Sequence, residues 1–121
     1  MSSNKIRDQT KKNIGLDCEQ LACEYLQEQG LQIVERNRHI SRVGEIDIVA
    51  LEENQFVFVE VRSISSSYIH PSQLLSAKKQ HRLIVLAKLW LKLAGAREYE
   101  DRWRIDLITL NPEINWYKGI L

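Results

Sequence analysis

The sequence predicts an α/β protein with a mixed central β-sheet flanked by helices, in the order helix, three strands, helix, two strands. Apolar residues recur at helical spacing in residues 14–26 and again in residues 73–94. Two short strands with alternating apolar residues, joined by a polar turn, occupy residues 44–62. A chain of 121 residues is long enough for one hydrophobic core and too short for two domains. We expect a flexible basic tail over residues 1–12 and a single domain over residues 13–121.

The first helix is amphipathic, and Gly30 stands where a left-handed C-cap is expected. Its apolar stripe consists of Ile14, Cys18, Leu21, Ala22, Tyr25 and Leu26. Glu19 lies beside this stripe, so its carboxylate can point toward the sheet. A first strand is expected over residues 31–39.

The two strands in residues 44–62 are expected to pair as a hairpin through a turn at residues 52–54. Alternation places Glu45 and Asp47 on one face of the first strand. The opposite face would carry Ile46, Ile48 and Ala50. In the second strand, one face would carry Phe56, Phe58, Glu60 and Arg62, and the other Val57, Val59 and Val61.

The second half of the chain begins with an exposed, serine-rich loop over residues 63–72. The strongest helical pattern follows from Gln73 to Ala94, with Gly95 as its stop signal. Residues 103–110 are apolar on both faces, which favours a central strand, and residues 114–118 predict a short edge strand after a turn at Asn111 and Pro112.

Composition narrows the class of protein. The amino terminus lacks the apolar segment of a secretory signal, and the longest apolar run, Leu83–Ala94, is interrupted by Lys88 and Lys92. That run is shorter than the roughly 20 residues needed to cross a membrane. Cys18 and Cys23 point away from each other on one helix, so we expect reduced thiols and a cytoplasmic protein.

Three carboxylates are expected to converge at one end of the strand pair, from Glu45, Asp47 and Glu60. Acids in such apolar strands are costly to desolvate unless a cation or hydrogen bonds compensate them, and a divalent metal is a common reason to gather several. The structural alternative is a cross-strand acid pair neutralised by Arg62 and Arg42.

Two basic clusters flank these acids in the sequence, where groups that contact phosphate would be useful. Their candidate nucleic-acid-binding residues are Arg36, Arg38, Arg42, Lys78, Lys79 and Arg82. The alternative is that they are solvated faces, because the net charge of +1 does not by itself indicate a nucleic-acid binder. Trp90 is expected in the core, and Trp103 and Trp116 are expected to pack or to offer a base-stacking surface.

The acidic strand pair in this order of elements resembles the PD-(D/E)xK nuclease superfamily, and more closely the bacterial proteins of the YraN type. The resemblance spans residues 15–110. It rests on Gly15 with Glu19, Ala22, Tyr25 and Leu26, on GEID at 44–47, on FVEV at 58–61, and on Lys79 with Gln80.

This resemblance implies a restriction-endonuclease-like fold and a Mg²⁺-dependent endonuclease that hydrolyses phosphodiester bonds in nucleic acid, with DNA expected over RNA. It assigns Asp47 and Glu60 to the motif acids, and Glu19 as the helix acid that completes a site for Mg²⁺ or Mn²⁺. Glu45 and Gln80 are further candidate site residues. Cutting both strands of a duplex would require a homodimer.

The chain departs from this pattern at Arg62, which fills the position of the motif lysine. Arginine cannot act as a base, but its planar fork can clamp a phosphate or the charge of the transition state. The same fork could instead bond Glu60 or Asp47 and occupy the space of a metal. Two alternatives to an active nuclease therefore remain, a non-catalytic module that binds nucleic acid or a partner and a protein-interaction domain.

Overall fold

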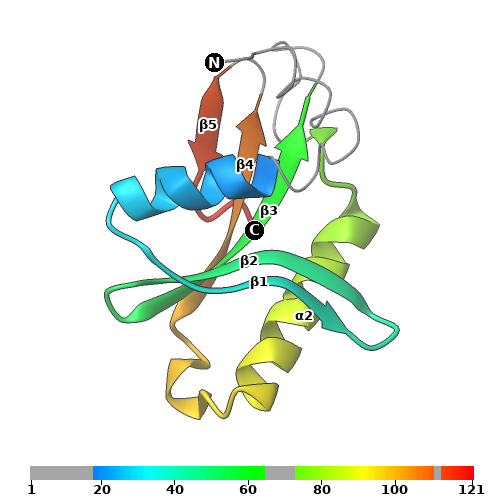
Figure 1. The fold of residues 1–121 in the computed structure, drawn as a ribbon. Coiled ribbons are helices and arrows are strands. Elements are labelled where there is room, and N and C mark those ends of the chain that lie inside the picture. The colour runs from blue at the N-terminus through cyan, green and yellow to red at the C-terminus, as the bar shows by residue number, and fades with distance from the viewer. Residues whose placement is uncertain (1–17, 65–72, 111–112) are drawn as a thin grey trace.

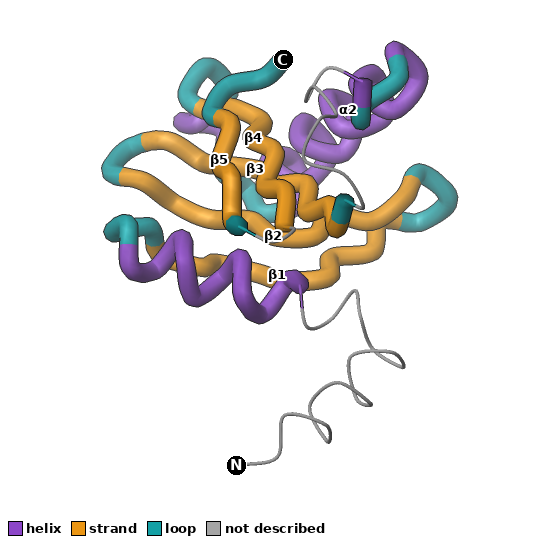
Figure 2. Tube along the Cα trace, turned by 90° about the horizontal axis from the view of Figure 1, so that it is seen from above, coloured by secondary structure: helices purple, strands orange, loops and turns teal. Residues whose placement is uncertain are grey.

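The computed structural model describes residues 18–64, 73–110 and 113–121. These residues form a five-stranded mixed sheet with one helix against each face (Figures 1 and 2). The predicted α/β class and order of elements are confirmed, and they are consistent with a restriction-endonuclease-like fold. The expected tail, most of the serine-rich loop and the turn at residues 111–112 lie outside the described residues.

The strands lie side by side in the order of the chain. They are β1 (Gln32–Ile40), β2 (Gly44–Glu52), β3 (Gln55–Ser63), β4 (Trp103–Leu110) and β5 (Ile114–Tyr117). β3 and β4 are parallel and the other neighbours antiparallel. A parallel pair needs a long crossover, and helix α2 supplies it. The predicted hairpin, the interior position of β4 and the edge position of β5 are all confirmed.

The amino-terminal helix, described over residues 18–28, buries Ala22, Cys23 and Leu26 against the sheet. Gly30 follows it at φ 95°, the left-handed conformation expected of a C-cap. Both cysteines are free thiols, as predicted, and burial raises the pKa of Cys23.

Helix α2 (Ala77–Leu93) begins four residues later than the sequence predicted. The side chain of Ser76 accepts a hydrogen bond from the backbone nitrogen of Lys79, and an N-cap of this kind fixes where a helix starts. Gly95, at φ 69°, lies just beyond the helix, where the stop signal was expected. No helix among the described residues is both long and apolar enough to span a membrane.

Each face of the sheet has its own hydrophobic core. On the α2 face, Phe56 and Phe58 of β3 pack against the buried ring of Trp90, with ring centroids 5.0 and 5.7 Å away. On the other face, Val57 and Val59 pack with the amino-terminal helix. The predicted alternation of β3 and the core position of Trp90 are therefore confirmed.

In β2 the predicted alternation is wrong at one point. Ile46 belongs to the core under α2, whereas Ile48 and Ala50 belong to the opposite core, although all three were expected on one face. The β1–β2 pairing is interrupted here, because Asn37 and Asp47 lie unpaired between two regular ladder pairs. Asn37 has φ 51°, so the backbone of β1 departs from regular strand geometry beside the point where the faces of β2 change.

Candidate functional site

The candidate site forms where β2 separates from β3. The last β2–β3 ladder pair toward this end is Ile48 with Val59, and beyond it β2 continues with β1 away from the sheet (Figure 1). The Val61 amide of β3 donates instead to the side chain of Asp47, with 2.9 Å between its nitrogen and Oδ2. Asp47 therefore supplies the acceptor that a continuing β2 strand would have provided.

Glu60 lies on the α2 face of β3 and is only 4% exposed. Its Oε2 is 3.2 Å from Nζ of Lys79 on α2 and 3.1 Å from Nε of Arg62 on the same strand. The Arg62 contact is an ion pair without hydrogen-bond geometry. The predicted pairing of Arg62 with Glu60 is thus confirmed, and Lys79, one of the candidate phosphate contacts, joins it on the same oxygen.

The carboxyl group of Asp47 lies within hydrogen-bonding range of the carboxyl group of Glu60. Burial, and then the negative charge of Glu60, raise the pKa of Asp47 to about 7, while the Val61 amide acts in the opposite direction. A hydrogen bond between the two carboxyl groups raises it further. Asp47 therefore exchanges its proton near neutral pH and is available to a cation there.

Glu19 belongs to the same electrostatic cluster. Burial, and then the charge of Glu45, raise its pKa, whereas Arg36 and a hydrogen bond from the Asn37 side chain lower it. Its Oε1 is buried without a hydrogen-bond partner among the described residues. A buried carboxylate oxygen without a donor is costly, so this atom is a candidate ligand for a cation.

These acids fit Mg²⁺ by donor type, because hard divalent cations prefer carboxylate oxygens. Even so, no three His, Cys, Asp or Glu side chains in the described part of the chain are grouped closely enough to hold a metal ion. The charges of Glu45 and Glu60 act on Glu19, and those of Glu60 and Glu19 act on Asp47. The side chains of Lys79 and Arg62 form ion pairs with Glu60. Metal ligation by Glu19, Asp47 and Glu60 stays a prediction that requires side-chain movement.

Comparison with known proteins identifies relatives of this chain. The model of the family described as "Uncharacterised protein family UPF0102" matches residues 18–110. The chain belongs to the UPF0102 family. A UPF0102 protein of Caldanaerobacter subterraneus subsp. tengcongensis is 36% identical over 104 residues, which cover 85% of this chain and 84% of that protein. UPF0102 proteins of Vibrio vulnificus and Coxiella burnetii are each 36% identical, over 88% and 91% of this chain and 90% and 92% of theirs.

The match of the UPF0102 family confirms the resemblance to YraN-type proteins that the motifs predicted. It covers the strands that carry Asp47 and Glu60 and the helix that carries Lys79.

The predicted basic residues of this UPF0102 protein divide into two settings. Arg36 donates to Gln20 on the amino-terminal helix, and Arg38 pairs with Glu35, whose other oxygen accepts from Trp90. The second setting is the start of α2 and the adjacent β1–β2 turn. There, Lys78 and Arg42 are exposed, and the side chain of Arg82 lies against Gly44, where a Cβ would be 3.3 Å from Cδ of Arg82.

The side chain of Gln80, a candidate site residue, bonds the backbone instead of the acids. Its amide donates a hydrogen bond to the carbonyl of Leu75 at 2.9 Å, in the segment before α2. Asn37 is the site residue that sequence reasoning missed. Asparagine adopts positive φ more readily than other non-glycine residues, so an Asn inside a strand pattern was the available signal.

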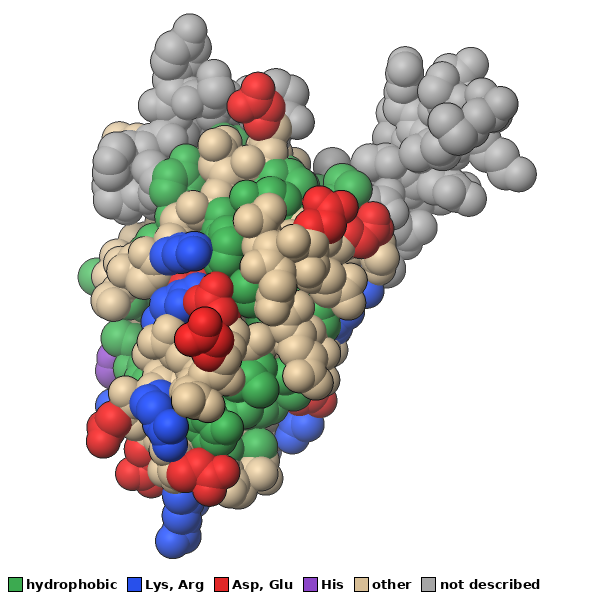
Figure 3. Space-filling view, turned by 90° about the vertical axis from the view of Figure 1, so that its left-hand side faces the viewer, with side chains coloured by type: hydrophobic (Ala, Val, Ile, Leu, Met, Phe, Trp, Pro, Cys, Tyr) green, Lys and Arg blue, Asp and Glu red, His purple; other side chains and the backbone are tan. Residues whose placement is uncertain are grey.

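The face toward the β2–β3 turn is a poor nucleic-acid surface. Figure 3 shows acidic and basic side chains interspersed there with hydrophobic ones. The shallow hollow at this turn is lined by Glu52, Glu53 and Asp101 against one arginine, Arg102. The start of α2 differs from this face, because its first turn carries basic residues and no acid.

Proposed function

We propose that this UPF0102 protein is a metal-dependent nuclease that hydrolyses phosphodiester bonds in nucleic acid, with DNA as the expected substrate. The observation that carries the proposal is the close contact between the carboxyl groups of Asp47 and Glu60 at the point where β2 leaves β3. Perturbed acids of this kind concentrate at functional sites, since a purely structural role rarely requires buried carboxylates to face one another.

Asp47, Glu60 and the unpartnered Oε1 of Glu19 would hold Mg²⁺. A bound Mg²⁺ would supply positive charge to the phosphate and lower the pKa of a water molecule. The protein's own contribution is to fix Asp47 through the Val61 amide and to exclude water around the nearly buried Glu60.

Lys79 is the best candidate for the part that the motif lysine plays, rather than Arg62. Its ammonium lies 3.2 Å from Glu60, and a lysine amine can hold, orient or give up a proton. Arg62, on the same carboxylate oxygen, stays charged at every accessible pH, so its role is to attract phosphate.

The test is cleavage of labelled duplex, single-stranded and branched DNA and the matching RNAs by purified protein with Mg²⁺ or Mn²⁺. Wild type should cut at least one substrate, and Asp47→Asn, which keeps an acceptor for the Val61 amide, should lose at least about 10²-fold in rate. Glu53→Gln removes an exposed acid at the β2–β3 turn and should leave the rate unchanged. Equal cleavage rates for wild type and Asp47→Asn would mean that a contaminating nuclease, and not this protein, cuts the substrate.

A second candidate is a non-catalytic module that binds nucleic acid. It is favoured by one observation, that Lys79 and Arg62 already neutralise Glu60 without a metal. Under this alternative, all substrates would bind but none would be cut with either metal.

A further inference from the structure

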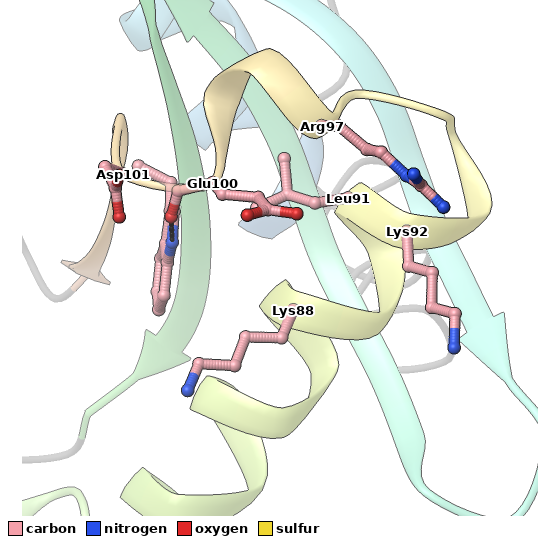
Figure 4. A pocket seen from close by; sticks show the side chains of 7 residues that line it. Lys88, Leu91, Lys92, Arg97, Glu100 and Asp101 are labelled. Carbon is pink, nitrogen blue, oxygen red and sulfur yellow. Dashed lines mark hydrogen bonds between the residues drawn. The ribbon is translucent and has the colours of Figure 1, made fainter.

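A second site of a different character lies at the far end of α2. A hollow of about 450 Å³ opens between the last turns of α2, the short helix η2 (Arg97–Tyr99) and the start of β4 (Figure 4). Charged side chains and one indole line it, namely Lys88, Lys92, Arg97, Glu100, Asp101 and Trp103. Hollows of this size accommodate small ligands.

The charges in this pocket are separated and do not neutralise one another. No ion pair involving these five charged side chains is found within the described residues. In Figure 4, Lys92 and Arg97 point the same way at one end of the hollow, and Asp101 lies at the other end. The carboxylate of Glu100 lies between them, and the side chain of Lys88 extends toward the Asp101 end. A ligand that matches this pattern carries an anion at the end of Lys92 and Arg97. At the other end it carries hydrogen-bond donors for the two carboxylates and an acceptor for Lys88.

Contacts within the protein already hold the wall of the pocket that carries Glu100 and Asp101. Trp103 donates its Nε1 hydrogen to the carbonyl of Glu100 at 2.8 Å and packs edge-on to Phe58. Tyr99 of η2 packs against Phe56, with ring centroids 4.6 Å apart, and carries the guanidinium of Arg102 over its ring. A wall that is already ordered loses little conformational entropy when a ligand binds.

We propose that this pocket binds a nucleotide unit, with its phosphate toward Lys92 and Arg97 and its base toward Trp103 and the two acids. Lysine and arginine are the usual phosphate partners, and an indole offers a surface on which bases stack. Carboxylates accept hydrogen bonds from exocyclic amino groups, which cytosine has and uracil lacks. Of the two pyrimidines compared, the pocket therefore prefers cytosine, because uracil presents a carbonyl oxygen to Glu100 and Asp101 where cytosine presents its amino group.

The pocket is distinct from the acid cluster. Lys88 follows Lys79 by nine residues, which is about 14 Å along a helix, and Lys92 lies farther on. The inference does not depend on the proposed cleavage, because nucleotide binding here is measured without metal and in Asp47→Asn as well. Failure of either proposal can then be recognised separately.

The experiment is titration of ¹⁵N-labelled full-length protein with CMP and, separately, with UMP, followed by the indole N–H signal of Trp103, which Trp103→Phe assigns. CMP should shift this signal and the amides of Lys88–Leu93 saturably, with a Kd at least about tenfold below that for UMP. Lys92→Gln with Arg97→Gln should weaken both nucleotides. Glu100→Gln with Asp101→Asn should remove the preference for CMP, and Lys118→Gln, on an exposed lysine beyond β5, should change neither.

Three results would overturn the proposal: no saturable shift up to about 10 mM nucleotide, equal affinity for CMP and UMP, or shifts confined to residues around Asp47. The source of the nucleotide is decided with oligonucleotides. A duplex with one unpaired terminal cytosine should shift Trp103 at concentrations about tenfold or more below CMP if a strand end is the ligand. A free nucleotide is the ligand if blunt and overhanging duplexes both bind more weakly than CMP.

Discussion

The ammonium nitrogen of Lys79 lies 3.2 Å from Oε2 of Glu60, so a lysine from α2 reaches the carboxylate that β3 carries. The strand position two residues after Glu60, where the nuclease pattern has lysine, holds Arg62 instead. An amine is therefore present at the acid pair although the motif position lacks one. This arrangement changes what substitutions at the two positions should do.

Lys79→Arg should lower the rate of Mg²⁺-dependent cleavage by about 10²-fold or more, because the guanidinium keeps the charge but cannot exchange a proton. Arg62→Lys should change the rate by less than about tenfold, since an amine is already in place. Single-turnover cleavage with saturating protein measures both. A large gain in rate from Arg62→Lys would show that Lys79 does not fill this role.

The stability of the metal-free protein should depend on pH through Asp47. Its pKa is raised to about 7 in the folded state from about 3.9 when unfolded, so the folded state holds the proton more tightly. The contribution of Asp47 to stability is therefore full below about pH 4 and is lost as pH rises through 7. Urea unfolding at several pH values should show Asp47→Asn gaining stability relative to wild type over this range.

The control for this pH effect is Asp101→Asn, an exposed aspartate far from the cluster, whose difference from wild type should not change with pH in the same way. A constant difference between wild type and Asp47→Asn from about pH 4 to 8 would show that the pKa of Asp47 is not raised in the folded state.

Substitutions of Asn37 should distinguish the effect of its backbone conformation on stability from the effect of its side chain on metal binding. At φ 51°, Asn37→Ala should lower the free energy of unfolding by roughly 1–2 kcal/mol, and Asn37→Gly should lower it less because glycine accepts this conformation. Both variants remove the hydrogen bond to Glu19, so both should weaken Mn²⁺ binding. Urea unfolding and calorimetric titration measure the two effects. Equal destabilisation by Ala and Gly would mean that the φ angle does not matter.

The start of α2 should bind phosphate groups. Lys78 lies in the first turn of a helix that carries no acid there, an arrangement that opposes the helix dipole and suits an anion. In binding to duplex DNA by Asp47→Asn, replacing Lys78 and Arg82 by Gln should flatten the dependence of log affinity on log salt by about 0.9 for each phosphate that the protein no longer neutralises. The exposed Lys118→Gln serves as control, and an unchanged slope in the double variant would place the binding face elsewhere.

Most of the fold could be predicted from the sequence, because the core strands alternate regularly and the helices bear their own capping residues. The prediction failed at Ile46 and Ile48, since a pattern of period two cannot reveal where two paired strands depart from regular geometry, as they do at Asn37 and Asp47. It also placed the start of α2 at Gln73, although Ser76 is the cap.

At the site, the sequence identified Asp47 and Glu60 and the proximity of Arg62. Whether Lys79 reaches Glu60 or points to solvent depends on how α2 packs across β3, which no local pattern encodes. For the same reason, nothing in the spacing of Lys88, Arg97 and Trp103 indicated a pocket at the other end of the helix.

The central claim is that the acid cluster holds a divalent cation, and the most direct measurement is anomalous scattering from crystals soaked in Mn²⁺ at a pH above the pKa of Asp47. We predict a Mn²⁺ peak ligated by Asp47 and Glu60, with the Glu60 carboxylate turned away from Lys79, and no peak in crystals of Asp47→Asn. A cluster without manganese in fully soaked crystals, with Glu60 still paired to Lys79 and Arg62, would contradict it.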